Sequence, residues 1–373
     1  MIGELLRRIG ESWSALGLAA PPQPSDVAWV VINGGISVQT KLVCLLWTDG
    51  GREPRFVVKF ARHPQYNARL QAEYSALEEM QSYLPVGPSM VPAPLLTFCL
   101  GDLLVTVETA VSGRPLRLYL RERPRQQLRT LHRLEPLVEW LTSMHARSAR
   151  PATGTDIRSF ILEPLMIPEE ELGGLSSEEQ QGIERLSLLA EKLIDSHTLP
   201  LVFNHNDMGA TNIMVGEDGS LTGIIDWESG AFGLPASDII YFLSRYGHET
   251  RDVEGEEPLK GFREMFFLPE RVEKGVIPIS LTEKLLSAYC RRLDVDREWL
   301  PLLFGITWIL HARNERRRLM TESGSAYGEP AATKSSLDTD RTVQKAHFRS
   351  HLRYFLENWD SSLVVATAKG SMR

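Results

Sequence analysis

Three polar residues, His205, Asp207 and Asn212, interrupt an apolar stretch in the pattern H-x-D-x-x-x-x-N, and Asp226 follows further along the chain. An unpaired carboxylate is costly inside an apolar core, so something must compensate these side chains. Strand-like residues follow Asn212 and precede Asp226, which predicts a hairpin that brings the amide and the carboxylate together. Both are hard oxygen ligands of the kind that Mg²⁺ prefers. The pattern therefore predicts a cleft that holds a metal ion and a phosphate group.

A second set of candidate residues lies in the first hundred positions. Lys59 stands inside the otherwise apolar strand-like run 55–60, and Glu73 lies in the predicted helix that follows it. A strand lysine and a helix glutamate can pair so that the ammonium is fixed against phosphate oxygens. The Gly turn at 33–37 offers backbone N–H groups that could cover phosphates. Taken singly, Lys59 also fits a solvated strand face, and two glycines in a turn are commonplace.

The elements that must position these residues change character along the chain. Residues 27–60 and 97–111 have strand composition with Gly-containing turns, and residues 66–84 predict a helix between them. After residue 116 helical periodicity dominates. Further predicted elements are helices at 134–148, 176–196, 302–320 and 345–359 and short strands at 201–203, 213–215 and 221–225. The predicted fold class is therefore α+β.

Composition narrows the classes of function. The formal net charge is −7, which argues against a nucleic-acid-binding surface. No apolar run reaches the length that a membrane span needs, and charged residues interrupt the N-terminal segment where a signal peptide would be apolar. The three cysteines, Cys44, Cys99 and Cys290, lie far apart and are expected to be reduced and buried. We expect a cytoplasmic protein with no nucleic-acid or membrane partner; the oligomeric state is not predicted.

The chain resembles the aminoglycoside phosphotransferase and choline kinase-like family, small-molecule kinases with a protein-kinase-like fold. The resemblance covers roughly residues 25–245. It rests on the stretches NGGIS, VVKF, the helix with Glu73, LTSMHA, HNDMGATNIMV and GIIDWESGAFGLPASDI. It implies a two-lobe architecture with a small antiparallel β-sheet and one main helix in the N-lobe, and a larger, mostly helical C-lobe.

Composition and periodicity, together with the resemblance, predict a division of the chain into parts. These are an N-terminal helix packing on the body (1–24), a nucleotide-binding N-lobe (25–110), a catalytic and acceptor-binding C-lobe (111–320), a flexible loop (321–341) and a C-terminal helix and tail (342–373).

Carried over by position, the family's roles fall on particular residues of this chain. ATP would lie between the lobes with its adenine against residues 108–111, and Glu73 would orient Lys59 toward the α- and β-phosphates. The ATP-binding residues implied are Lys59, Glu73, Gly34, Gly35, Ser37, Glu108, Thr109 and Val111.

The resemblance assigns the catalytic loop as well. Asp207 would be the catalytic base, and Asn212 and Asp226 would hold Mg²⁺. His205 and Asp238 would support the loop structurally. The chain departs from the family pattern at Asn206, where Gly is usual, and at Leu234, where Asp is frequent; neither position carries the chemistry.

The function implied is an ATP-dependent kinase that phosphorylates a hydroxyl group of a small molecule, with ATP and Mg²⁺ as cofactors. The alternatives are a nucleotide-binding pseudokinase or regulatory protein, and a protein kinase. The Trp-Glu after Asp226, in place of Phe-Gly, favours the small-molecule enzyme over a protein kinase. The acceptor is not identified. Acid-rich segments at 163–195 and 249–257 suggest a cationic acceptor such as an amine or aminoglycoside, although solvated helix faces would look the same.

Overall fold

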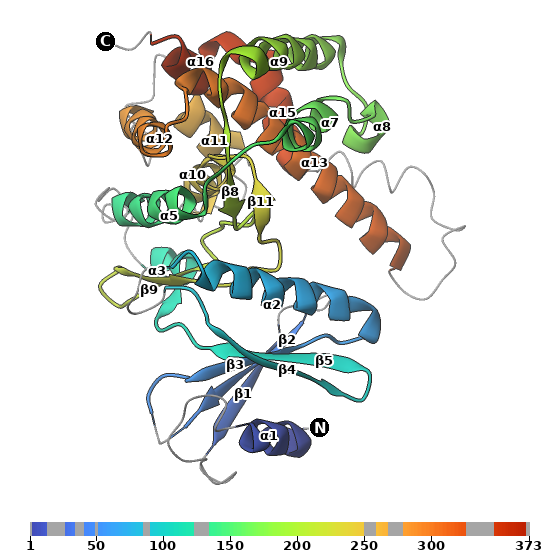
Figure 1. Cartoon of the computed structure of the whole chain (residues 1–373), viewed down its shortest axis with the longest axis vertical. Coiled ribbons are helices and arrows are strands. Elements are labelled where there is room, and N and C mark those ends of the chain that lie inside the picture. Colours follow the sequence, from blue (N-terminus) through green and yellow to red (C-terminus); the bar gives the residue numbers. More distant parts are fainter. Residues whose placement is uncertain are drawn as a thin grey trace. The chain divides into compact units, whose positions relative to one another are not determined.

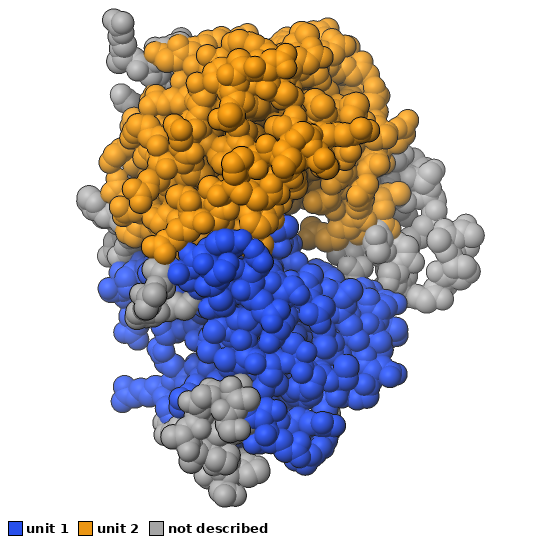
Figure 2. All heavy atoms as spheres, in the orientation of Figure 1, with its two compact units in different colours: residues 1–122, 205–231 blue, residues 123–204, 232–373 orange. Residues whose placement is uncertain are grey.

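The computed structural model describes residues 2–12, 27–33, 41–48, 51–84, 90–122, 134–249, 259–267, 279–325 and 347–370. The chain forms two compact units, which Figure 2 distinguishes by colour. Unit 1 comprises residues 1–122 and 205–231, and unit 2 comprises residues 123–204 and 232–373.

A five-stranded antiparallel sheet with the order β1-β2-β3-β5-β4 forms the centre of unit 1. Its strands are rich in Val, Leu and aromatic residues, which suit a pleated sheet. Two helices accompany it, and Figure 1 shows α1 and α2 on opposite faces of the sheet. The bounds are α1 (Ile2–Glu11), β1 (Ala28–Asn33), β2 (Leu42–Trp47), β3 (Phe56–Phe60), η3 (Pro64–Tyr66), α2 (Asn67–Gln81), β4 (Pro94–Leu100) and β5 (Leu103–Thr109).

The alternation of side chains along β3 and β5 gives the sheet one apolar and one partly polar face. On the first face, Leu5 and Ile9 of α1 join a buried cluster with Cys44, Leu46, Phe56, Val58, Phe60, Val105 and Val107. Lys59 lies one residue out of phase, opposite Thr106, so it belongs to the other face. Glu108 shares that second face, because it lies opposite Val57. The pleat therefore turns the charged side chains of β3 and β5 toward α2.

A second, smaller sheet attaches the segment 205–231 to unit 1. It has the order β10-β9-β6 and is made from β6 (Arg114–Pro115), β9 (Ile213–Val215) and β10 (Leu221–Ile224), with α3 (Leu116–Arg121) directly after β6. The N–H of Arg117 donates to the carbonyl oxygen of Ala210 at 2.9 Å. The Thr222 hydroxyl donates to the carbonyl oxygen of Ser112 at 2.7 Å. These bonds explain why the segment predicted to belong to the larger lobe clusters with the N-terminal sheet. The predicted domain boundaries themselves remain a proposal.

Unit 2 is mostly helical, with one small sheet of order β11-β8-β7. Helix α9 begins with the predicted capping box, in which Ser176 and Glu179 each bond the other's backbone N–H. The elements are α5 (Leu134–Ser148), β7 (Arg150–Pro151), α6 (Gly154–Ile157), η5 (Arg158–Leu162), α7 (Glu163–Leu165), α8 (Glu169–Leu172), α9 (Ser177–Ser196), β8 (Pro200–Asn204), β11 (Ala231–Gly233), α10 (Ser237–Glu249), α11 (Leu259–Phe266), α12 (Ile279–Leu293), η7 (Arg297–Trp299), α13 (Leu300–Ser325), α15 (His347–Glu357), η9 (Trp359–Ser361) and α16 (Leu363–Ala368).

The α+β class, with a small antiparallel sheet and a larger helical part, is confirmed. Three details differ from the prediction. Helix α13 extends to Ser325, so the expected loop 321–341 starts as helix, and residues 326–341 lie outside the described part. The expected C-terminal tail contains α16, whose Leu363, Val364 and Val365 are buried. Cys99 is exposed rather than buried.

Among the helices that the structure describes, none has the length and apolar character needed to cross a lipid bilayer.

Gly223 in β10 provides a test of how tightly unit 1 is packed. A Cβ atom at this position would lie 2.4 Å from Cγ1 of Val111 and 2.6 Å from the carbonyl oxygen of Met90. We expect Gly223→Ala to lower the free energy of unfolding by about 1–3 kcal/mol, because the backbone must shift. Gly51→Ala is the matched control, since its Cβ would lie 3.4 Å from the Thr48 carbonyl oxygen, an ordinary contact. Urea unfolding curves measure both; equal losses would show that the site is not tightly packed.

Candidate functional site

Lys59 lies fully buried between two carboxylates. Its Nζ is 2.6 Å from Oε1 of Glu73 on α2 and 2.6 Å from Oε1 of Glu108 on β5. Burial lowers the pKa of the Lys59 ammonium, but Glu108 and Glu73 outweigh it and the net pKa is raised. For Glu73, burial raises the pKa of the carboxyl group. The positive charges of Lys59 and Lys41 lower it by more, so the net pKa is below its ordinary value. The predicted Lys59–Glu73 contact is therefore present, as an ion pair shielded from water.

Glu108 has a different environment from the one expected at the edge of an adenine pocket. Its side chain is buried and points to Lys59, and burial raises its pKa to about 7 even though Lys59 acts to lower it. Thr109 accepts a hydrogen bond from the Ala93 N–H through its hydroxyl at 2.8 Å. Val111 approaches Gly223. Adenine binding by residues 108–111 remains a prediction.

A second lysine, Lys41, extends the charged network and was not predicted from the sequence. It lies immediately before β2, and its Nζ is 2.6 Å from Oε2 of Glu73 and 3.4 Å from Oε2 of Glu228. The same ammonium contacts Oδ1 of Asp226. The carboxylates of Glu73, Asp226 and Glu228 raise the pKa of Lys41 against the lowering effect of burial. Lys41 thus connects the ion pair between Lys59 on β3 and Glu73 on α2 to the segment after β10.

The loop after β8 folds around Asp207 and Asn212. The Asn212 side chain donates from Nδ2 to the backbone oxygen of Asp207 at 2.9 Å and to its Oδ2 at 3.2 Å. His205 accepts at Nδ1 from the Asp207 N–H at 3.2 Å, and its Nε2 is 2.9 Å from the carbonyl oxygen of Ile225. His205 therefore carries its proton on Nε2 and ties the loop to the residue before Asp226. Asp207 itself is exposed, while His205 and Asn212 are buried.

The predicted hairpin between Asn212 and Asp226 is present. Strands β9 and β10 pair antiparallel, and the Ile225 N–H donates to the Asn212 carbonyl oxygen at 2.9 Å. Asp226 follows with a positive φ of 69°, which turns the chain out of the strand. The next residue, Trp227, is fully buried against the His205 ring, with centroids 4.6 Å apart. This packing explains why a Trp follows the aspartate.

Asn206, where the family usually has Gly, also has a positive φ, of 62°. Glycine adopts this left-handed conformation most easily, and Asn is among the few other residues that tolerate it. The Asn206 side chain donates from Nδ2 to the carbonyl oxygen of Ser229 at 2.9 Å. The substitution therefore preserves the backbone conformation and adds a bond between the two loops.

The remaining predicted site residues are placed elsewhere. Gly34, Gly35 and Ser37 lie outside the described residues. Asp238 belongs to unit 2, where it is buried with Oδ2 3.4 Å from Nε2 of His145. His145, from the LTSMHA stretch, contacts the Tyr289 hydroxyl at 2.7 Å, and that hydroxyl accepts from the Ala236 N–H. A role for Asp238 in supporting the catalytic loop remains a prediction.

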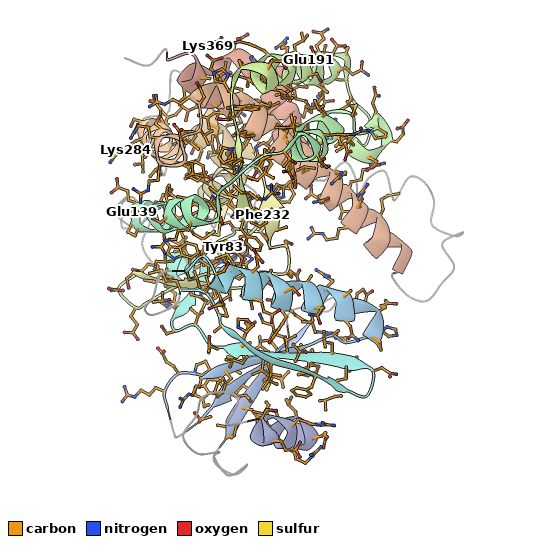
Figure 3. All side chains as sticks on the ribbon, in the orientation of Figure 1. Tyr83, Glu139, Glu191, Phe232, Lys284 and Lys369 are labelled. Atoms are coloured by element: carbon orange, nitrogen blue, oxygen red, sulfur yellow. The ribbon has the colours of Figure 1, made fainter. Side chains whose placement is uncertain are left out.

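The acid-rich segment 163–195 lies in unit 2, and some of its charges have partners there. Glu171 pairs with Arg317 at 2.6 Å, and the buried Glu179 pairs with Arg349. Glu169 accepts from Gln180 at 2.7 Å. Glu191 is exposed on α9 (Figure 3). Residues 250–257 of the second acidic segment lie outside the described part.

The donor groups near Asp226 fit a magnesium ion that is shared with phosphate oxygens. Asn212 uses its amide nitrogen toward Asp207, which leaves the amide oxygen as the atom that could bind a metal ion. Asp226 already attracts one cation, the Lys41 ammonium. No group of three or more His, Cys, Asp or Glu side chains within the described ranges could hold a metal by itself. Two protein ligands completed by phosphate and water are typical of Mg²⁺ sites.

The pKa of Glu108 predicts a specific dependence of stability on pH. The folded protein binds this proton up to about pH 7, whereas the ordinary value is 4.5. The protonated carboxyl therefore contributes stability that is complete below pH 4.5 and is lost as the pH rises through 7. Glu108→Gln keeps an oxygen for Lys59 but does not titrate. We expect the stability of the wild type relative to this variant to fall from about pH 5 to about pH 7.5.

Chemical denaturation of both proteins at several pH values measures this difference. The lowered pKa values of Glu73 and Asp226 affect stability only at more acidic pH, so they do not obscure the window. A difference that is flat or rises with pH would contradict the environment described for Glu108.

Three solved structures are among those that match this chain. An ADP-bound aminoglycoside phosphotransferase, APH(2'')-Ib, matches with 12% identity and a TM-score of 0.45, covering 88% of this chain and 94% of that one. The Streptomyces rimosus enzyme APH(3'')-Id, in complex with ADP and streptomycin, matches with 13% identity and a TM-score of 0.43, covering 84% and 99%. A Plasmodium vivax ethanolamine kinase matches with 13% identity and a TM-score of 0.45, covering 90% and 83%.

A comparison with curated proteins gives no match. The sequence model of the phosphotransferase enzyme family, APH, matches residues 29–273, about two thirds of the chain. That range contains Lys41, Lys59, Glu73 and the whole 205–226 segment. The chain therefore belongs to the phosphotransferase enzyme family.

Proposed function

We propose that this phosphotransferase is an ATP-dependent small-molecule kinase that transfers the γ-phosphate of ATP to a hydroxyl group of its acceptor. One observation carries the proposal. The buried Lys59–Glu73 pair, Asp207, Asn212 and Asp226 all belong to the same compact unit. Phosphoryl transfer depends mainly on positioning and on neutralising phosphate charge, and these residue types supply both.

Lys59 is the proposed ligand of the α- and β-phosphates. Glu73 and Glu108 hold its ammonium from two sides, so its position is fixed before a nucleotide arrives. Pre-positioned charge is effective because the protein does not reorganise during the reaction. ATP binding by Lys59 is thus supported by its burial as well as by its place in the sequence.

Asp207 is the proposed catalytic base. Its exposed side chain is fixed by the Asn212 amide, and its backbone by His205 and Asn212. In this role Asp207 accepts a hydrogen bond from the acceptor hydroxyl, aims the hydroxyl oxygen at the γ-phosphorus and takes the proton as the bond forms. Asn212 and Asp226 are the proposed protein ligands of Mg²⁺. When bound, that ion supplies positive charge to the phosphate oxygens.

The acceptor is proposed only as a class, a small molecule with a hydroxyl group. The named aminoglycoside phosphotransferases and ethanolamine kinase suggest amino-alcohols and aminoglycosides as first compounds to try. The negative charge of the 163–195 segment would favour a cationic acceptor. The pairing of Glu171 and Glu179 with arginines reduces the negative charge that is left to attract it. A cytoplasmic location is also proposed, since the three cysteines are free thiols.

An ATP-consumption screen against a library of hydroxyl compounds tests the activity, with each product identified by the mass of the added phosphoryl group. A neutral set and a cationic set of compounds, measured at low and high salt, test the charge of the acceptor. Tight Mg-ATP binding without turnover of any compound would favour the alternative, a nucleotide-binding regulatory protein.

The two aspartates provide the decisive contrast. Asp207→Asn should leave Mg-ADP affinity nearly unchanged and lower kcat by about 10²-fold or more, the scale of general-base catalysis. Asp226→Asn should weaken Mg-ADP binding and abolish turnover, because a charged metal ligand is lost. Calorimetric titration with Mg-ADP and kinetics on an acceptor from the screen separate the roles. Equal losses of nucleotide affinity in both variants would overturn the assignment.

A further inference from the structure

Lys41 has a position that ordinary surface lysines do not have. Its side chain is only 16% exposed, and its ammonium lies among three carboxylates from two segments, Glu73 on α2 and Asp226 and Glu228 after β10. Arg69 binds the other oxygen of Glu228 at 2.6 Å but is 47% exposed and sits at the edge of the cluster. Lys41 is thus the central cation of this group of acids.

The three acids need a cation for a simple electrostatic reason. The Glu73 side chain is only 3% exposed, and Lys59 is bound to its Oε1, whereas its Oε2 faces Lys41. Like charges brought together in a partly buried site repel strongly unless a positive charge separates them. Without Lys41, the partly exposed Asp226 and Glu228 carboxylates and the buried Oε2 of Glu73 would lie together with no cation between them.

We propose that Lys41 is a tethered cation that occupies the metal position at Asp226 in the nucleotide-free protein and competes with the metal ion for that carboxylate. The proposal rests on the proposed function, because it takes Asp226 to be a metal ligand. The Lys41 ammonium contacts Oδ1 of Asp226, so a metal bound by this carboxylate meets a positive charge already in place. Lys41 is therefore a positioning residue, which stabilises the empty site and raises the metal concentration needed to fill it.

Competition between the Lys41 ammonium and a metal ion for Asp226 corresponds to a coupling free energy. This energy can be measured without nucleotide or acceptor. The test variant is Lys41→Met, which keeps the length of the side chain and removes the charge. The first readout is Mn²⁺ affinity, from the electron paramagnetic resonance signal of the free ion. The second is the melting temperature in EDTA and in excess Mg²⁺.

We expect Lys41→Met to bind Mn²⁺ about tenfold more tightly than the wild type, within the usual range of coupling between two binding events. Its melting temperature should fall in EDTA and recover in Mg²⁺ by more than the wild type gains. Lys41→Arg keeps the charge and should retain the weak Mn²⁺ affinity. Arg69→Met is the matched control: it removes the more exposed cation bound to the other oxygen of Glu228, and should change Mn²⁺ affinity much less.

A Lys41→Met protein with unchanged or weaker Mn²⁺ affinity would overturn the proposal. If that variant does not fold, Lys41→Gln replaces it, and failure of both to fold even in excess Mg²⁺ would also overturn it, since the metal should substitute for the lysine. The outcome is independent of turnover. If the wild type phosphorylates an acceptor but Lys41→Met leaves Mn²⁺ affinity unchanged, only this inference is disproved. If Lys41→Met raises Mn²⁺ affinity but the wild type phosphorylates no acceptor, only the proposed function is disproved.

Discussion

The carboxylate of Glu73 binds Lys59 through one oxygen and Lys41 through the other, at 2.6 Å in each case. Breaking a buried ion pair from one side leaves an uncompensated charge, which typically costs about 3–5 kcal/mol. Each lysine in turn holds another carboxylate, Glu108 or Asp226. Sheet, helix and hairpin are therefore connected through one side chain, and the arrangement of charges in unit 1 depends on it.

The two faces of the sheet differ in what stabilises them. Along β3, Phe56, Val58 and Phe60 pack into the apolar cluster beneath α1, so burial of apolar area stabilises that face. Lys59, one residue out of phase, lies on the other face, where its ammonium pairs with Glu73 and Glu108. A one-residue slip of β3 would exchange the faces and place Lys59 in the apolar cluster. The register that builds the core also places the lysine.

Residue types and periodicity predicted those features that follow from local rules. The strands of the larger sheet, α2 and the hairpin between Asn212 and Asp226 follow from alternation and turn residues. The Lys59–Glu73 contact was expected because a strand lysine and a helix glutamate can pair to fix the ammonium against phosphate oxygens. Lys41 escaped prediction because a lysine at the start of a strand is usually solvated, and its three partners are distant in sequence. The burial of Glu108 beside Lys59 depends on the pairing of β3 with β5, which the sequence does not specify. The only indication of the positive φ at Asn206 was that the family usually has Gly at this position.

A double-mutant cycle on Mg-ADP affinity tests most directly whether Lys59 and Glu73 act as one phosphate-binding unit. Calorimetry would compare the wild type with Lys59→Met, Glu73→Gln and the double variant, after circular dichroism has shown that each is folded. Our expectation is that Lys59→Met weakens Mg-ADP binding, that Glu73→Gln weakens it less, and that the double variant loses much less than the sum of the two. Additive losses, or unchanged affinity in a folded Lys59→Met protein, would contradict it.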